Sequence, residues 1–249
     1  MPRPVPAPPA QLDRRTLREE VLAVLSLSLL ASAVYAVLSL VEGPLRGAVV
    51  AAADQDPRLA RQLVGIVFGL APVYLVWHLL RRSGEGPATI GVGTERAAAQ
   101  VRDAAILAAA IGLAGAGVYA ASVSLGLNRI VVPVPPLGHW WTVPMLVLHA
   151  VRASAVEEVI VLGYLVTRLE QLGWSSRGAI AASALLRATY HLYQGWGGFV
   201  GNLAMGLLFG SLFVRRRRLG PFLVAHVLLD VGAGLVYVLA RDRLPALFG

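Results

Sequence analysis

The chain has 249 residues, of which 57% are hydrophobic and 14% charged, and it contains no cysteine. A soluble domain carries roughly a quarter of its residues as charged side chains, so this composition excludes an ordinary soluble fold. The lack of cysteine excludes disulfides, thiolate catalysis and cysteine metal sites. All 22 basic residues are arginine, and the formal net charge is +8. These arginines stand mostly at the ends of apolar runs rather than in one basic patch, so we expect no nucleic-acid partner.

The first 18 residues contain five prolines and four arginines. They lack the apolar core of a signal peptide, which predicts a short disordered tail over residues 1–18. The loops after it are too short to hold a second domain. We therefore expect residues 19–249 to form a single transmembrane helical domain.

Apolar runs of about 20 residues follow the tail, the length that a helix needs to cross the hydrocarbon of a bilayer. They predict an all-α, polytopic transmembrane helix bundle of about seven spans, with six and eight as the neighbouring counts. The expected spans are residues 20–42, 62–80, 102–126, 142–168, 178–193, 198–214 and 219–240.

Arginines are unevenly distributed over the connections between the expected spans. The tail and the connections 81–101, 169–177 and 215–218 are rich in arginine, whereas 127–141 and 194–197 are poor. The positive-inside rule then predicts a cytoplasmic N-terminus. The exclusive use of arginine is typical of a GC-rich bacterial genome, so we expect a multi-pass protein of a bacterial plasma membrane.

Polar side chains are concentrated in the last four spans, and inside a bilayer such groups are costly and mark functional sites by default. They are Glu157, Glu158, Arg187, His191, Asn202, His226 and Asp230. Counted from the cytoplasmic ends of their spans, five of them lie roughly 12 to 21 Å deep, in one layer near the midplane. His226 and Asp230 share a helix face, as do Arg187 and His191. Arg152 lies nearer the outer end of its span, where it can snorkel to the surface.

A carboxylate pair and two histidines in a water-poor layer suit the activation of water. A glutamate can take a proton from water, one histidine can orient or share it, and the second can steady a developing oxyanion. Two histidines and a carboxylate can also ligate zinc, here His191, His226 and Glu157. The zinc-protease pattern H-E-x-x-H does not occur in the chain, and the sequence leaves both chemistries open.

Three segments of this region stand in a recognisable order. Residues 157–165 read Glu-Glu-Val-Ile-Val-Leu-Gly-Tyr-Leu, residues 187–191 read Arg-Ala-Thr-Tyr-His, and residues 226–230 read His-Val-Leu-Leu-Asp. Together they resemble the motifs E-E-x-x-x-R-G, F-x-x-x-H and H-x-x-x-N/D of the CAAX protease and bacteriocin-processing (CPBP) family of intramembrane proteases. The resemblance implies an endopeptidase with a CPBP-like catalytic core over residues 142–240.

The resemblance also implies a role for each matching residue. Glu157 and His191 activate the water, and His226 with Asp230 supports the oxyanion or the site. The substrate is a protein or peptide associated with the lipid bilayer. The family has been labelled metalloprotease, but a glutamate-activated water without metal is the other interpretation. We expect no required cofactor, with zinc as the alternative.

Two positions depart from the family motifs. Leu162 stands where the first motif has arginine, and Arg187 stands where the second has phenylalanine. We hypothesise that Arg187 gives Glu158 the positive partner that the motif arginine usually gives. Adjacent helical residues point about 100° apart, so one glutamate can be catalytic, which we expect of Glu157, and the other structural. Asn202 is expected to support the site by hydrogen bonding between helices.

Two other functions fit the same polar layer. A family member that binds membrane proteins without cleaving them is favoured by Leu162, but the presence of Glu157, His191 and His226 argues against it. A proton-linked transporter also places carboxylates and histidines at the midplane. The inverted repeat common in transporters is not visible in this chain. We further expect Tyr190, Tyr193 and Gln194 to line a substrate entrance.

Overall fold

The computed structural model of the chain describes residues 6–7, 9, 12–93 and 95–248. Residues 1–5, 8, 10 and 11 of the expected disordered tail therefore lie outside the described residues. Helix α1 begins at Arg14, within the stretch expected to be a tail, so the tail boundary at residue 18 stays a prediction. Asp13 caps this helix, its side-chain oxygen accepting a hydrogen bond from the backbone N–H of Thr16 at 2.7 Å.

The described residues form an almost entirely helical structure, which confirms the all-α class. The α-helices are α1 (Arg14–Ser26), α2 (Leu29–Glu42), α3 (Leu59–Gly69), α4 (Ala71–Arg82), α5 (Ala97–Ser124), α6 (Thr142–Glu157), α7 (Val166–Gln171), α8 (Ser176–Tyr190), α9 (Trp196–Arg216), α10 (Gly220–Ala240) and α11 (Pro245–Phe248). A π-helix, η2 (Glu158–Leu165), joins α6 to α7, and two short 3₁₀ helices are η1 (Pro87–Ile90) and η3 (Leu192–Gln194).

Each expected span falls on one of these helices or on a consecutive set of them. Within the described residues, four helical segments are long and apolar enough to cross a bilayer: Leu59–Arg82, Ala97–Ser124, Trp196–Arg216 and Gly220–Ala240. The pair α1 and α2 gives a fifth if it is counted as one bent span. The number of seven spans therefore stays a prediction.

Two of the expected straight spans are broken. Helices α1 and α2 meet at an angle of 53°, and at this break the Ser28 hydroxyl donates to the carbonyl oxygen of Val24 at 2.6 Å. Helices α3 and α4 meet at Leu70, and Pro72 stands in the first turn of α4. Proline has no N–H for the preceding turn, so it favours the start of a new helix here.

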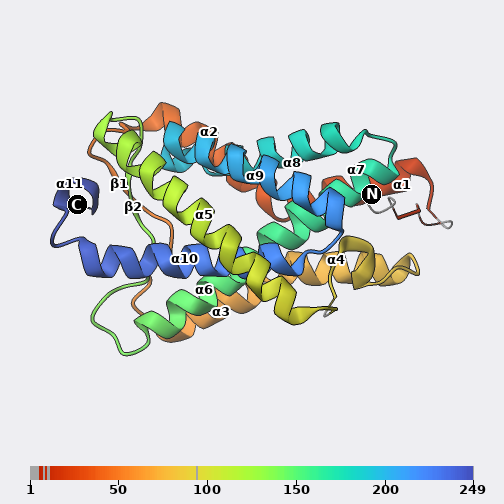
Figure 1. The fold of residues 1–249 in the computed structure, drawn as a ribbon, viewed down its shortest axis with the longest axis horizontal. Helices are drawn as coiled ribbons and strands as arrows, with labels where there is room; N and C mark the ends of the chain where they lie inside the picture. The colour runs from red at the N-terminus through yellow and green to blue at the C-terminus, as the bar shows by residue number, and fades with distance from the viewer. Residues whose placement is uncertain (1–5, 8, 10–11, 94, 249) are drawn as a thin grey trace.

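A small parallel sheet, which the sequence pattern does not predict, ties two loops together. Strand β1 (Val49–Ala51) pairs with β2 (Ile130–Val132). Figure 1 shows this sheet and α11 at one end of the bundle, with α1, α4 and α7 at the other. The two loops that precede α3 and α6 thus lie at the same end, as expected if the spans alternate in direction.

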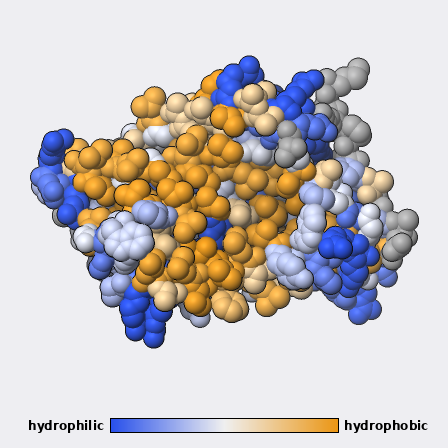
Figure 2. Space-filling model, turned by 90° about the horizontal axis from the view of Figure 1, so that it is seen from below, coloured by the Kyte–Doolittle hydropathy of each residue, from blue (hydrophilic) through white to orange (hydrophobic). Residues whose placement is uncertain are grey.

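The surface of the bundle is that of a membrane protein. Figure 2 shows a broad hydrophobic surface between hydrophilic groups at the two ends. Large apolar side chains such as Val41 and Leu113 are 86% and 79% exposed. Exposure of this extent over long helices is stable in lipid and unfavourable in water.

The main core is built around η2, whose eight residues are all buried. Ile160, Leu162 and Tyr164 of η2 pack in one cluster with Phe209 of α9 and Phe222 of α10. This packing makes the segment that carries the double glutamate the most enclosed part of the molecule.

Arg129, in the connection between α5 and β2, joins two distant parts of the chain. Its side chain donates to the carbonyl oxygens of Ser39, Gly43 and Pro44 at the end of α2. It also donates to the carbonyl of Tyr193 in η3, at 2.6 Å. The end of α2 is therefore held against the segment that follows α8.

We predict that Arg129→Met lowers the free energy of unfolding by about 3 kcal/mol, because buried carbonyl acceptors lose their donor. The measurement is thermal unfolding of the purified protein in lipid nanodiscs. Arg46→Met is the matched control, because Arg46 is exposed in a neighbouring loop. Equal stability of the two variants contradicts the prediction.

Candidate active site

The two adjacent glutamates stand at the junction of α6 and η2 and have different surroundings. Glu157 is the last residue of α6, and its side chain is 14% exposed. Glu158 is the first residue of the π-helix, and its side chain is 0% exposed. A π-helical turn takes more residues than an α-helical turn and often occurs at functional sites.

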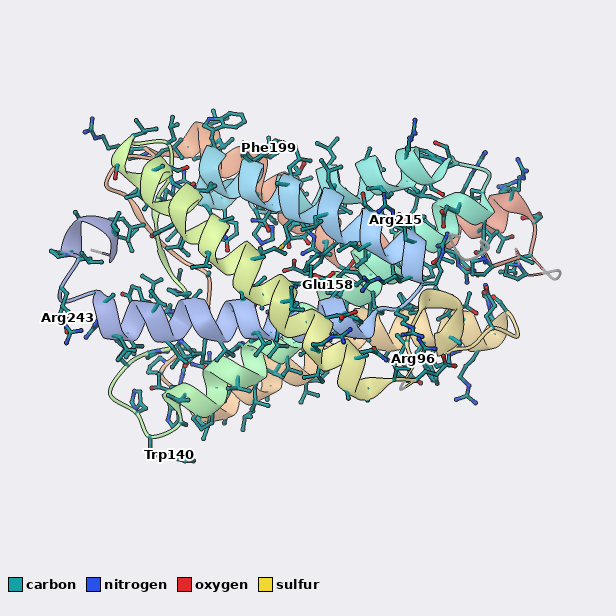
Figure 3. The ribbon with its side chains drawn as sticks, viewed as in Figure 1. Arg96, Trp140, Glu158, Phe199, Arg215 and Arg243 are labelled. Carbon is teal, nitrogen blue, oxygen red and sulfur yellow. The ribbon has the colours of Figure 1, made fainter. Side chains whose placement is uncertain are left out.

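Glu158 forms the centre of a buried network of charged groups. Its Oε1 accepts hydrogen bonds from Nη2 of Arg187 and from Nδ1 of His226, both at 2.7 Å. The hypothesised pairing of Arg187 with Glu158 is thereby confirmed. Figure 3 places Glu158 within the bundle, between Trp140 and Arg243 toward one end and Arg96 and Arg215 toward the other.

Arg187 reaches this network from α8 and is almost fully enclosed, at 1% exposure. Its guanidinium carbon lies 5.9 Å from the centre of the Phe209 ring. Gly206 of α9 makes room for it, since a Cβ there would lie 2.8 Å from the Cα of Ala184 and 3.4 Å from Arg187 Cδ. The small residue thus lets α8 and α9 approach closely.

His226 of α10 lies between two carboxylates. Its Nδ1 contacts Glu158, and its Nε2 lies 3.5 Å from Oδ2 of Asp230, whose side chain is 41% exposed. Because a carboxylate only accepts hydrogen bonds, both ring nitrogens act as donors when the imidazole is doubly protonated. His226 and Asp230 therefore belong to the support of Glu158.

Glu157 is held by two donors, both on the same oxygen. Its Oε2 accepts from the Tyr190 hydroxyl at 2.8 Å and from Nη1 of Arg187 at 3.4 Å. Among the described contacts, Oε1 of Glu157 takes no hydrogen bond. That oxygen is the one available to a water or a substrate.

His191 caps the C-terminal end of α8. Its Nδ1 lies 3.0 Å from the carbonyl oxygen of Arg187 and donates to it, since a carbonyl only accepts. In the neutral ring this leaves the lone pair on Nε2. The imidazole lies between Tyr190 and Tyr193, with ring centres 4.7 Å and 6.3 Å away.

Glu157 and His191 border one cavity of about 1010 Å³. Its wall is mostly apolar and is formed by Leu27, Ser28, Leu29, Ser32, Tyr35, Ala36, Ser39, Ala51, Ala52, Phe68, Gly69, Ala71, Pro72, Leu75, Arg152, Ala153, Val156, Glu157, Tyr190, His191 and Tyr193. Both helix breaks contribute to this wall. The predicted site residues are thus divided into a pair that faces the cavity and a network that lies behind it.

Asn202 takes no part in either group among the described contacts. Its side-chain nitrogen donates to the carbonyl oxygen of Gly198, one turn earlier in α9, at 2.9 Å. The expected hydrogen bond between helices is therefore not among its described contacts.

Residues 139–232 match the sequence model of a family of proteases, the type II CAAX prenyl endopeptidases, Rce1-like. This stretch contains Glu157, Glu158, Arg187, His191, Asn202, His226 and Asp230. The region that holds the candidate site therefore matches the CAAX protease family. The comparisons with curated proteins and with solved structures found no match.

The donor set that the sequence predicts for zinc, His191, His226 and Glu157, does not fit the ion. His226 directs both ring nitrogens at carboxylate oxygens. Within the part of the chain that the structure describes, no group of three or more His, Asp or Glu side chains is arranged to hold a metal. We therefore derive no step through a metal ion.

The two residues that depart from the family motifs have different surroundings. Leu162, at the position of the family arginine, is 2% exposed and packs in the apolar core around η2. The positive charge reaches Glu158 from Arg187 on the neighbouring helix instead. Glu158 therefore has a positive partner although Leu162 stands at the position of the motif arginine.

Two cavity residues have roles that sequence reasoning missed. The hydroxyl of Tyr190 bonds Glu157, and the only sequence signal was its position next to His191. Arg152 was expected to snorkel, but it forms part of the cavity wall. Of the residues expected at a substrate entrance, Tyr190 and Tyr193 line the cavity, whereas Gln194 bonds the Tyr193 hydroxyl at 3.0 Å.

We predict that Arg187→Leu destabilises the fold by about 3–5 kcal/mol, because it leaves the Glu158 charge buried without its arginine. The measurement is protein accumulation in membranes together with thermal unfolding in nanodiscs. The double variant Arg187→Leu/Glu158→Gln removes both charges and should recover most of the loss. Wild-type stability of the single variant, or no recovery in the double, contradicts the pairing.

Proposed function

We propose that this protein is an intramembrane endopeptidase that hydrolyses peptide bonds of membrane-associated proteins or peptides. The water is activated by Glu157 and His191. One observation carries the proposal: these residues come from different helices, α6 and α8, and border the same largely apolar cavity. The match to a protease family supports the same reaction class.

In the proposed reaction, Glu157 accepts a proton from a water molecule while the water oxygen attacks the carbonyl carbon of the substrate. His191, with its lone pair on Nε2, orients the water from the other side. The carbonyl electrons move to the oxygen and form a tetrahedral intermediate. The C–N bond then breaks and the departing nitrogen takes the proton from Glu157. The products are a carboxylic acid and an amine, which become a carboxylate and an ammonium when the acid proton moves to the amine.

The buried network positions the two reacting groups in this proposal. Arg187 contacts both glutamates, at 2.7 Å and 3.4 Å. Its backbone carbonyl also fixes the ring of His191. His226 and Asp230 hold Glu158 from α10, so we assign them to support of the site rather than to the oxyanion.

The entrance of the cavity supports a substrate that arrives from the bilayer. The cavity residues Leu27, Tyr35 and Phe68 are 69%, 72% and 73% exposed. An apolar, exposed rim suits a hydrophobic segment of another membrane protein. We include in the proposal a bacterial plasma membrane and a cytoplasmic N-terminus, which the distribution of arginines supports.

We predict that Glu157→Gln abolishes the cleavages made by the wild type, because an amide cannot accept the proton from water. The measurement is quantitative mass spectrometry of protein termini in membranes from cells that produce each protein at matched levels. New peptide ends should be present with the wild type and absent with Glu157→Gln. Asp242→Asn, at an exposed acid near the end of α10, should behave as the wild type.

Two outcomes of this experiment count against a protease. Identical termini in wild-type and Glu157→Gln membranes favour the non-catalytic binding member or the transporter. Equal loss of cleavage in Glu157→Gln and Asp242→Asn indicates a general effect of substitution rather than the chemistry of Glu157.

We also predict that a zinc chelator leaves the rate of cleavage by the purified protein unchanged, because His226, one of the three expected ligands, directs both ring nitrogens at carboxylates. The measurement is cleavage of one substrate from the termini experiment, with and without chelator. A loss of activity that added zinc restores, while cobalt or magnesium does not, contradicts this prediction.

A further inference from the structure

Arg152 and Glu157 of α6 line the same cavity. With Ala153 and Val156 they cover an arc of about 140° of the helix circumference, at about 100° per residue. Five helical residues rise by about 7.5 Å, so Arg152 stands roughly that far along the axis from Glu157. Among the residues of the described cavity wall, these two carry the formal charges.

The half-buried Arg152 side chain differs from the buried arginines of the protein. Arg168, Arg187 and Arg217 each pair with a glutamate, and Arg129 donates to several backbone carbonyls. Among the described contacts, Arg152 has no hydrogen bond or ion pair, and its Nε is buried without a partner. A guanidinium in apolar surroundings is costly without an anion, so this position is suited to receive one.

The end of α3 leaves space for the Arg152 side chain in the cavity wall. A Cβ at Gly69 would lie 2.5 Å from Nη1 of Arg152 and 2.8 Å from its Cδ. The absence of a side chain at Gly69, directly before the break between α3 and α4, therefore makes space for the arginine. Any larger residue at that position would displace it.

We infer that Arg152 binds a carboxylate of the substrate and selects peptides that carry one near the cleaved bond. This inference rests on the proposed function of the same cavity. An extended peptide advances about 3.3–3.6 Å per residue, so the distance along α6 corresponds to about two residues. The carboxylate is a free C-terminus or an acidic side chain about two residues from the cleaved bond. The arginine guanidinium can bind either kind of carboxylate through two hydrogen bonds.

The test measures binding, so that it does not depend on turnover. Three labelled peptides of Ala, Leu and Val are titrated against the Glu157→Gln protein in nanodiscs. One ends in a free carboxylate, one in an amide, and one in an amide with a glutamate two residues from the end. Adding Arg152→Gln to this protein should weaken the binding of the carboxylate peptide that Arg152 recognises by about tenfold. It should leave the binding of the plain amide peptide unchanged.

Further variants separate charge from position. Arg152→Lys should retain part of the discrimination, because it keeps the charge but loses the bidentate geometry. Gly69→Ala keeps the arginine but displaces it, and should reduce the discrimination as well. Arg61→Gln is the matched control, since Arg61 is exposed on α3 and its partner is Asp56. It should bind all three peptides as the parent does.

The outcomes distinguish the inference from the proposed function. If Arg152→Gln weakens the binding of only the free-carboxylate peptide, Arg152 binds a C-terminal carboxylate. If it weakens the binding of only the glutamate peptide, Arg152 binds an acidic side chain. An equal loss of affinity for all three peptides, or no loss for any of them, overturns the inference. If carboxylate discrimination is found while the termini experiment shows no cleavage, the proposed reaction fails and the binding site remains. If cleavage occurs without discrimination, only the inference fails.

Discussion

The carboxylate of Glu158 is the point at which three helical segments meet. One of its oxygens receives Arg187 from α8 and His226 from α10, both at 2.7 Å, while the residue itself begins η2. Inside a bilayer, water is scarce and cannot replace a lost partner, so these hydrogen bonds fix how each helix is rotated and how deep it sits. The end of α8, with His191, is positioned as a consequence.

The same network explains how two adjacent glutamates can differ in role. Arg187 gives Glu158 a short contact and Glu157 a longer one, and the Tyr190 hydroxyl completes the environment of Glu157. The buried carboxylate is held by charged donors, whereas one oxygen of its neighbour has no hydrogen bond among the described contacts. Leu162 occupies the position of the motif arginine, and the positive charge next to Glu158 comes from Arg187 instead. An arginine on a neighbouring helix meets the same electrostatic need.

The helices and the polar pairs were predictable from the sequence because they depend on residues close together in the chain. Long apolar runs predict membrane helices, and the i, i+4 spacing of His226 and Asp230 predicts their contact. Long-range features were not predictable in the same way. The pairing of β1 with β2 joins three-residue strands that are far apart in the chain. The residues of the π-helix are all buried, so no amphipathic pattern in the sequence marks it. Arg152 illustrates the limit, because its role depends on Gly69 and on a helix break in a different span.

The broken helices also bear on how a membrane segment can be cleaved at all. A helical substrate keeps its carbonyl groups in its own hydrogen bonds, so an attack on one of them requires local unwinding. Unwinding in an apolar environment exposes backbone groups that need new partners. Hydroxyl groups are spread over the otherwise apolar cavity wall, from Ser28, Ser32, Ser39, Tyr190 and Tyr193. In the proposed reaction these hydroxyls supply hydrogen bonds to an unwound substrate, and the breaks in the surrounding helices create the space that it needs.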